Sequence, residues 1–471
     1  MPIPDRWPRA GLLAVAAVTA VRLGVAARWG LLADEAYHWT WSLRPALGYY
    51  DQPPLVAWVL WLGAHLGGHH AIALRAPAVL GWGAAALVLA RWVRSRETWL
   101  WWALGLPPLA LLTVLAVPDG LLLPLWALGL GAAIRGGRGW WAAGVLGGLA
   151  SLTKYTGIGL LPLLILGADP AERRTRDPWI GLALAVALLA PNLLWNAAHG
   201  WVSFAFQLHE GLLSPHPPGL GGIVRQVLDQ ALFAGPIAAA AGAVWMARGA
   251  IGWRGLDRVD RLCLATSAPL AVGFALAALG GPPEAYWPAP AWIGVGLGLA
   301  RSGGRLLRVA SLAVALSALQ TAAIAVHAER PLLPLVADPG TRLTEGRLMA
   351  DLVAQWVVPA SAEGGREALP VYTERYQEAA LLRWHTGLDA HTLPGCGRRS
   401  QDDLDRADGR LPAAPAAEAW FLRPARSGPP ACAEAWYGRL RGPHPIWPID
   451  AQGRRVGPWD LFEASERREA P

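Results

Sequence analysis

The stretch AGLLAVAAVTAVRLGVAARWGLLADEAYHW, residues 10–39, joins an apolar run long enough to cross a bilayer to an acidic, aromatic loop. A second polar and aromatic segment, YYDQPP at residues 49–54, follows shortly after it. Carboxylates are costly at membrane depth unless they are hydrated or paired, so acids beside a membrane span indicate a functional site. We therefore expect the chemistry of this chain in the region of these two segments.

The composition is that of a polytopic membrane protein. The chain has 471 residues, of which 54% are hydrophobic and 16% charged, and its mean hydropathy is +0.30. The 27 tryptophans suit the membrane interface, so we expect many of them near helix ends. The net charge of +7 comes from arginines dispersed in short clusters between apolar runs, which argues against nucleic-acid binding.

The fold class predicted from these runs is an α-helical polytopic membrane domain at residues 1–327, followed by a small extracytoplasmic α/β domain at residues 328–471. About eleven spans are expected. They cover residues 10–28, 71–90, 98–116, 120–134, 140–153, 155–167, 179–195, 227–247, 262–279, 287–300 and 307–327. The pair 140–153 and 155–167 could equally be a broken or re-entrant segment. We expect the first span to be retained, because no small-residue cleavage site precedes the acidic loop.

Orientation follows from arginines, which concentrate in alternate loops, starting with Arg6 and Arg9. Positively charged short loops stay in the cytoplasm, so the N-terminus is predicted inside and the segment after residue 328 outside. In that segment we expect a strand at 369–373, a helix at 376–385 and a strand at 420–423. Cys396 and Cys432 could form a disulfide there, whereas Cys263 lies in an apolar run.

Asp34 and Glu35 are the first catalytic candidates. An exposed carboxylate can act as the general base that removes a proton from an attacking hydroxyl or amine. The alternative is that Asp34 only begins a helix. Aromatic neighbours, His38 and Tyr50 among others, favour a pocket for sugar rings or lipid headgroups. Asp51 and Gln52 precede two prolines that stiffen the turn, although the same residues could simply mark the entry to a helix.

Two further charges are predicted at the same membrane face. Asp119 follows a proline at the junction of two spans, where it acts either as a helix cap or as a second acid. Lys154 is the only lysine among 41 basic residues, which indicates a need for a compact ammonium that can contact a phosphate. The alternative for Lys154 is snorkelling to the interface.

A cluster of amides and aromatic rings, with Asn192, Trp195 and Asn196, ends another span on the predicted outer side. The shared sidedness of all these polar residues favours one external site over an interfacial belt.

At these residues the chain resembles the bacterial branch of the dolichyl-phosphate-mannose protein mannosyltransferase family, which is glycosyltransferase family 39 of the membrane-embedded GT-C class. The resemblance consists of short pieces in a fixed order over about the first 300 residues. These pieces are residues 34–39, 48–58, 75–78, 118–119, 154–156, 195–206 and 287–290.

The resemblance implies an inverting hexosyl- or pentosyltransferase of the bacterial cytoplasmic membrane. Such an enzyme moves a sugar from a polyprenyl-phosphate donor to an envelope glycan, lipid A or protein at the outer face. Carried over by position, Asp34 is the general base, Glu35 its neighbour in the motif and Asp119 the second acid. Lys154 would meet the leaving phosphate, with Tyr155, His38 or Gln52 as auxiliaries. Gln52 stands where family members often carry His or Lys, which weakens a phosphate role at this position.

No cofactor is expected, and no Gly-rich phosphate loop is found. We predict no metal, with a divalent cation on the acidic cluster as the open alternative. The rival functions are a secondary transporter or flippase for a lipid-linked or small solute, and a non-catalytic envelope scaffold. Transporters commonly carry internal repeats and bind solutes near the bilayer midplane, and we detect no repeat here.

Overall fold

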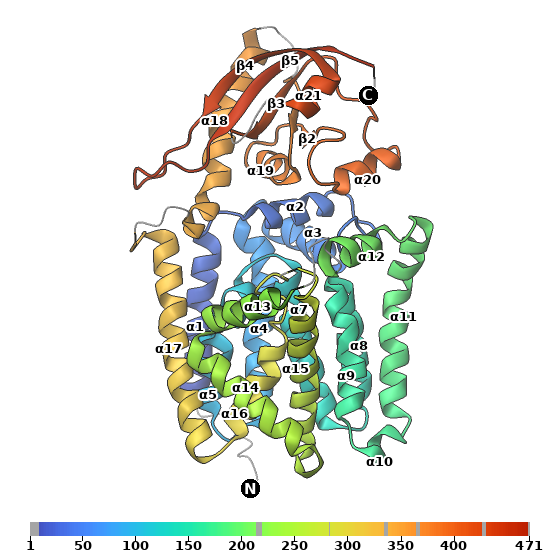
Figure 1. Ribbon diagram of the computed structural model, residues 1–471, viewed down its shortest axis with the longest axis vertical. Helices are drawn as coiled ribbons and strands as arrows, with labels where there is room; N and C mark the ends of the chain where they lie inside the picture. Colours follow the sequence, from blue (N-terminus) through green and yellow to red (C-terminus); the bar gives the residue numbers. More distant parts are fainter. Residues whose placement is uncertain are drawn as a thin grey trace. The chain divides into compact units, whose positions relative to one another are not determined.

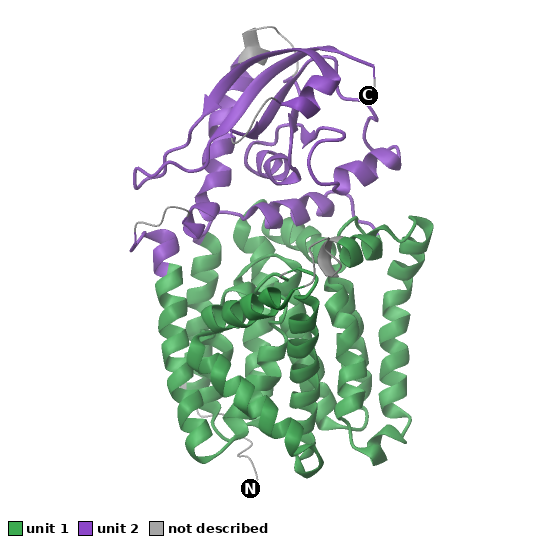
Figure 2. Ribbon diagram, viewed as in Figure 1, with its two compact units in different colours: residues 1–27, 47–325 green, residues 28–46, 326–471 purple. Residues whose placement is uncertain are grey.

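The computed structural model describes residues 9–212, 219–281, 283–333, 338–363, 368–425 and 430–469. It divides into two compact units, shown in different colours in Figure 2. Unit 1 comprises residues 1–27 and 47–325, and unit 2 comprises residues 28–46 and 326–471. From the sequence we assigned residues 28–46 to the membrane domain, whereas this segment belongs to the unit that contains the C-terminal part. Arg6 lies outside the described residues.

The described part of unit 1 consists of helices joined by loops and contains no strand (Figure 1). Its longer helices are α1 (Arg9–Arg28), α3 (Leu55–Gly67), α4 (Ala71–Leu89), α5 (Arg96–Gly105), α7 (Pro118–Arg135), α8 (Gly139–Thr153), α9 (Leu160–Gly167), α11 (Asp177–Ala198), α13 (Leu220–Ala234), α14 (Pro236–Ile251), α15 (Arg258–Ala277), α16 (Ala291–Arg301) and α17 (Gly304–Glu329). Short helical turns connect them: η1 (Ala90–Trp92), α6 (Pro107–Ala110), η2 (Leu112–Val114), η3 (Tyr155–Gly159), α10 (Pro170–Arg173), α12 (Val202–Phe206), η4 (Gln207–Leu212) and η5 (Trp253–Gly255).

Five described helices are long and apolar enough to cross a membrane, and two bent pairs would bring the number to seven. The expected spans 98–116 and 227–247 are both interrupted. Pro107 and Pro108 follow the end of α5, and α6 begins with Pro107, which needs no N–H partner at this position. Gly235 adopts a φ of 93° that favours glycine, and Pro236 then begins α14. The segments α13 and α14 are therefore bent by 116°.

Several tryptophans lie in the core of unit 1, whereas the sequence led us to expect many of them near helix ends. Trp82, Trp99 and Trp102 are fully buried. The indole N–H of Trp82 donates to the carbonyl of Ala103 at 2.8 Å, and that of Trp99 donates to the carbonyl of Ala86 at 2.8 Å. A buried indole needs such a partner, so each of these rings both fills space and joins two helices.

Small residues allow helices to approach closely within unit 1. Figure 1 shows α8 and α11 running side by side. A Cβ atom added at Gly144 on α8 would lie 2.1 Å from the carbonyl oxygen of Gly181 on α11. Glycine at both positions therefore brings the two backbones into contact, as is common between helices in membranes. Lys154 directly follows α8 in the chain.

Unit 2 is built on a mixed five-stranded sheet with the strand order β2-β1-β3-β5-β4. Its strands are β1 (Val371–Thr373), β2 (Ala390–Thr392), β3 (Ala419–Pro424), β4 (Tyr437–Ile446) and β5 (Trp459–Arg467). Its helices are α2 (Ala33–Ser42), η6 (Pro339–Thr341), α18 (Arg342–Glu363), α19 (Tyr376–Thr386), α20 (Gln401–Ala407) and α21 (Ala431–Trp436). The strand β1 pairs in parallel with β2 and β3, whereas β5 pairs antiparallel with β3 and β4. The helix α19 is the crossover between β1 and β2, as parallel pairing requires.

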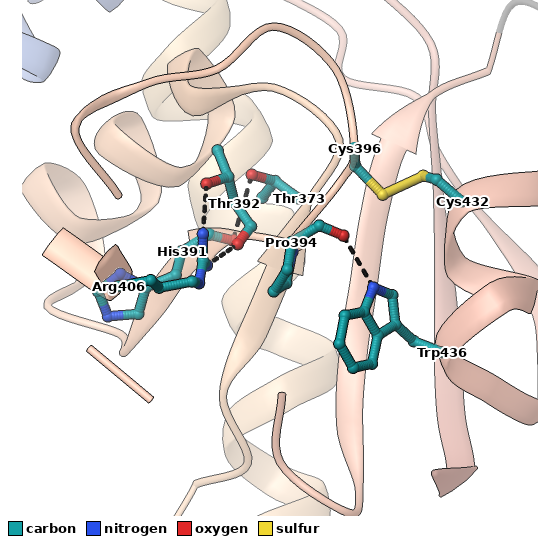
Figure 3. The surroundings of a disulfide bond; sticks show 8 residues. All are labelled: Thr373, His391, Thr392, Pro394, Cys396, Arg406, Cys432 and Trp436. Carbon is teal, nitrogen blue, oxygen red and sulfur yellow. Dashed lines mark hydrogen bonds between the residues drawn. A yellow bond between two sulfur atoms is a disulfide. The ribbon is translucent and has the colours of Figure 1, made fainter. Parts of the chain in front are cut away.

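The three elements predicted for this part of the chain are confirmed as β1, α19 and β3. The helix α19 ends at Gly387, whose φ of 70° is the left-handed conformation common after a helix. Cys396 and Cys432 form a disulfide, with Cα atoms 5.5 Å apart (Figure 3). Beside it, the indole of Trp436 donates to the carbonyl of Pro394 at 2.8 Å. Cys263 is buried in unit 1.

Removing this disulfide should destabilise unit 2. The bond closes a loop of 36 residues, for which loss of denatured-state entropy predicts ~3–4 kcal/mol. We expect the Cys396→Ser, Cys432→Ser double variant to show a lower melting temperature than the wild type under oxidising conditions. A reductant should lower the midpoint of the wild type and leave the variant unchanged. A reductant effect of equal size in both proteins would contradict this prediction.

Candidate functional site

The two acids of the first motif lie in the first turn of α2 and have different surroundings. Glu35 is fully buried, and its Oε2 accepts the N–H of Leu32 at 2.9 Å. It thereby satisfies one of the N–H groups that lack a partner at the start of a helix. Asp34 is exposed and lines a cavity of 430 Å³ within unit 2. Of the two carboxylates, Asp34 is the one that a ligand in this cavity can reach.

The helix α2 is held in place by elements from the C-terminal part of unit 2. The rings of Tyr37 and Tyr376 lie 4.1 Å apart, and those of Trp39 and Trp384 lie 5.0 Å apart. The N–H of Gln401, at the start of α20, donates to the hydroxyl of Tyr37 at 2.9 Å. The aromatic residues of the motif thus anchor α2, and they leave Asp34 at its exposed end. This explains why residues 28–46 belong to unit 2.

His38 packs on the same helix. It is buried, and its ring meets that of Trp41 edge-on at 4.6 Å. Arg44, just beyond the helix, forms an ion pair with Asp405 at 3.4 Å. His38 therefore belongs to the aromatic packing around α2, and its predicted role as an auxiliary toward the phosphate stays a prediction.

Lys154 and Asp119 form a buried ion pair in unit 1. Lys154 Nζ lies 2.9 Å from each carboxylate oxygen of Asp119, and both side chains are less than 10% exposed. The ammonium also lies over the rings of Tyr286, at 5.2 Å, and Trp287, at 5.7 Å. Such rings attract cations through their electron-rich faces. We placed both charges at one membrane face from the sequence, but the direct pairing was not predicted.

The loop that leads to Asp51 and Gln52 is fixed by side chains of later segments. Gln207 donates to the carbonyl of Asp51 at 2.7 Å, and Ser203 donates to the carbonyl of Tyr49. The ring of Tyr50 packs against Phe206 at 5.5 Å. Gln52 is half-buried, and its Oε1 has no hydrogen-bond partner in the described part of the chain. The amide oxygen of Gln52 can therefore still accept a hydrogen bond, at the residue where this chain differs from the family pattern.

A hydrogen-bond network next to this loop is formed by Asn192, Asn196 and Tyr155. Asn192 donates to the carbonyl of Leu47 at 2.8 Å, and Asn196 donates to the hydroxyl of Tyr155 at 3.1 Å. The hydroxyl of Tyr155 in turn lies 3.3 Å from Asn192 Oδ1. Both asparagines are fully buried. The structure thus gives these side chains partners within the protein, and their predicted substrate contacts remain predictions.

Trp195 lies on the same helix, α11, as Asn192 and Asn196. Its ring stacks on that of His199, with centroids 4.1 Å apart and planes 19° apart. A Cβ atom at Gly48 would lie 2.1 Å from the Trp195 ring, so glycine is required where the loop crosses it. The motifs around residues 48 and 195 are therefore in direct contact.

The predicted site residues fall into two groups. Asp34, Glu35 and His38 belong to unit 2. The remaining candidates, which include the Lys154–Asp119 pair, belong to unit 1. Their convergence in one external cavity stays a prediction. Among the described residues, no three His, Cys, Asp or Glu side chains gather closely enough to hold a metal ion.

Some residues near the candidate site were not predicted. Trp287 entered the sequence analysis only within residues 287–290 of the resemblance, and the isolated lysine was the feature that could have linked it and Tyr286 to a cation. Arg342, Arg375 and Trp459 line the cavity of Asp34 but come from the C-terminal part. No motif in the sequence distinguishes these residues.

His391 on β2, which is labelled in Figure 3, belongs to a second charged cluster of unit 2. Its Nε2 lies 3.0 Å from Asp389 Oδ1, and its Nδ1 lies 3.4 Å from Asp402 Oδ1. Burial alone would lower the pKa of His391, but its hydrogen bonds to the two carboxylates outweigh burial and raise this pKa. Burial would raise the pKa of Asp402, but His391, Arg383 and the N–H of Thr392 lower it to about 2.

The stability of unit 2 should depend on pH through this pair. The folded pKa of His391 is raised above 6.5, so its stabilisation is complete below about pH 6.5 and is lost as the pH rises through the folded value. Asp402 contributes fully above 3.8 and loses its contribution as the pH falls toward about 2. We expect a lower melting temperature at alkaline pH than in the window between these limits. His391→Asn should shrink the difference, and an unchanged difference in this variant would argue against the pair.

Comparisons with known proteins agree with these motifs. Residues 51–195 match the model of a family described as dolichyl-phosphate-mannose-protein mannosyltransferase. The chain is 36% identical over 210 residues to the lipid A galacturonosyltransferase RgtD of Rhizobium johnstonii. That alignment covers 41% of this chain and 44% of the relative, so it spans less than half of the relative's length. The resemblance to this glycosyltransferase family is thereby confirmed.

Solved structures show the same fold over nearly the whole chain. ArnT from Cupriavidus metallidurans bound to undecaprenyl phosphate matches with a TM-score of 0.63 at 13% identity, covering 97% of this chain and 98% of that one. The apo state of the same protein matches with a TM-score of 0.60 at 14% identity. A helical part with several long apolar helices, followed by a small C-terminal sheet domain, is therefore a fold that this chain shares with ArnT.

Proposed function

We propose that this chain is an inverting membrane glycosyltransferase that moves a sugar from a polyprenyl-phosphate donor to an envelope acceptor. The observation that carries the proposal is the match of residues 51–195 to the mannosyltransferase family. This segment contains the buried Lys154–Asp119 pair. The likeness to a lipid A galacturonosyltransferase favours a glycan or lipid as the acceptor. The protein would act in the bacterial cytoplasmic membrane, with its N-terminus inside and unit 2 outside.

The reaction assigned to Asp34 is proton removal. Its exposed carboxylate takes the proton of the acceptor hydroxyl, and the oxygen attacks the anomeric carbon of the donor sugar. The bond between that carbon and the polyprenyl phosphate breaks in the same displacement, which inverts the anomeric centre. The capping role of Glu35 holds the first turn of α2, so this residue would position its neighbour.

Lys154 is assigned to the leaving phosphate. An ammonium carries three donors, and the two oxygens of Asp119 accept two of them. The third donor is available to a phosphate oxygen in this proposal. In a site with little water, such a contact stabilises the departing anion more than it would in bulk solvent. Asp119 and the rings of Tyr286 and Trp287 would hold the ammonium in place.

The test is release of polyprenyl phosphate by the purified full chain in lipid. A panel of polyprenyl-phosphate sugars is supplied with a lipid, a glycan and a peptide acceptor, and the products are followed by mass spectrometry. We expect release with one donor and transfer to a glycan or lipid acceptor. A complete absence of release with every donor would count against the proposed function.

A further inference from the structure

The cavity beside Asp34 is a built pocket made from five segments of unit 2. It encloses 430 Å³, a volume in the range of small-molecule sites. Its lining comes from the start of α2, the helices α18 and α19, the end of β3, and the loop before β5. Met349, Leu381 and Trp459 give it an apolar, well-buried part.

The polar groups of the cavity carry both signs, with an excess of carboxylates. The carboxylates of Asp34, Glu345 and Glu378 line it together with the guanidinium groups of Arg342 and Arg375. Arg375 Nε lies 3.0 and 3.2 Å from the two oxygens of the buried Glu378, so this arginine is engaged within the wall. The three carboxylates and two guanidinium groups together give the lining of the cavity a net negative charge.

This charge balance disfavours a phosphate dianion and suits a neutral sugar. Sugar hydroxyls can donate to carboxylates and accept from a guanidinium or an amide, and Gln377 adds an amide to the lining. An apolar face with a tryptophan edge complements the C–H groups of a pyranose ring. A general base is also needed only for a neutral hydroxyl, because a phosphate oxygen is already ionised at neutral pH.

We infer that this cavity is the acceptor subsite and that it takes an unphosphorylated carbohydrate whose reacting hydroxyl lies at Asp34. Arg342 and Gln377 are assigned to hydrogen bonds with the other hydroxyls of the acceptor. The inference rests on the proposed function for the role of Asp34. The chemical class of the ligand is inferred from the residues that line the cavity, and it can be tested by a binding measurement that needs no enzymatic turnover.

Binding is measured first, on the full chain in lipid nanodiscs, by saturation-transfer NMR. The probes are chitobiose, its phosphate monoester and a serine-rich peptide. We expect a signal from chitobiose, a weaker one from the monoester, and loss of the chitobiose signal in Arg342→Ala and Gln377→Ala. Both side chains lie at the surface of the cavity, and circular dichroism checks that the variants fold. Arg347→Ala is the matched control, because Arg347 lies on the same helix and lines another cavity.

Kinetics provide the second measurement, once a donor and an acceptor are known. We expect Arg342→Ala to raise the KM for the acceptor by about tenfold or more, whereas Arg347→Ala should leave this KM at the wild-type value. Tighter binding of the monoester or the peptide than of chitobiose would overturn the inference. So would wild-type binding and KM in both cavity variants. An absence of donor cleavage by the wild type would instead refute the proposed function and leave the binding result standing.

Discussion

Replacing Asp34 with Asn should lower sugar transfer by about 10²- to 10⁴-fold. The substitution keeps the size of the side chain and removes the charge that accepts the acceptor's proton. Because Asp34 is exposed, the melting temperature should stay close to that of the wild type. Initial rates of transfer at saturating donor and acceptor measure the effect, and donor binding is followed separately with a spin-labelled or fluorescent polyprenyl phosphate.

The neighbouring acid supplies the comparison. Glu35→Gln preserves an oxygen that can accept the N–H of Leu32, so the cap on α2 should persist. If Asp34 is the base, the loss in Asp34→Asn should greatly exceed that in Glu35→Gln. Wild-type turnover of Asp34→Asn would show that this carboxylate is not the base of the mechanism.

Replacing Lys154 alone should unfold or strongly destabilise unit 1. Lys154→Met leaves the buried carboxylate of Asp119 without its cation, a change that costs about 3–5 kcal/mol in other proteins. In the Lys154→Met, Asp119→Leu double variant no buried charge remains. We therefore expect its melting temperature to recover most of the loss, while transfer stays abolished because no ammonium meets the leaving phosphate. Thermal unfolding and polyprenyl-phosphate release are measured on the same preparations.

The double variant separates a structural role of the pair from a catalytic one. A folded double variant that turns over at the wild-type rate would show that the pair only stabilises the helices. Lys154→Arg adds a further comparison: a guanidinium retains the charge but imposes a planar fork on Asp119. We expect partial stability and reduced transfer from it.

Local patterns predicted the elements of unit 2 because the information lies within a few residues. The β-strand at Val371–Thr373 and the helix at Tyr376–Thr386 follow from alternation and helical periodicity. The broken spans were missed for the opposite reason. The prediction of one continuous span at residues 98–116 relied on the hydropathy of the whole segment. It ignored the prolines at 107 and 108, although proline is a local sign that a new helix begins.

The candidate site was predicted as a set of residues, and its contacts were not. Asp119 and Lys154 are 35 positions apart, and their pairing depends on how α7 packs on α8. The contacts that hold α2 are even more distant in sequence, because Tyr37 contacts Tyr376 and Gln401, more than 300 residues later in the chain. The sequence shows that Tyr37 and Tyr376 are aromatic. It does not show which of many apolar surfaces each will cover.

Because α2 packs on α19 and α20, it can take its final position only after these two helices have been synthesised. A ribosome completes residues 33–42 long before it makes Tyr376 or Gln401, so the nascent acidic helix has no aromatic seat during most of translation. Domains that form from adjacent segments can fold as synthesis proceeds, whereas this one must wait for its far end. A chain shortened after α17 would keep its long apolar helices and lack the surface that orients Asp34. Loss-of-function truncations are thus expected even where every motif of the first 300 residues is intact.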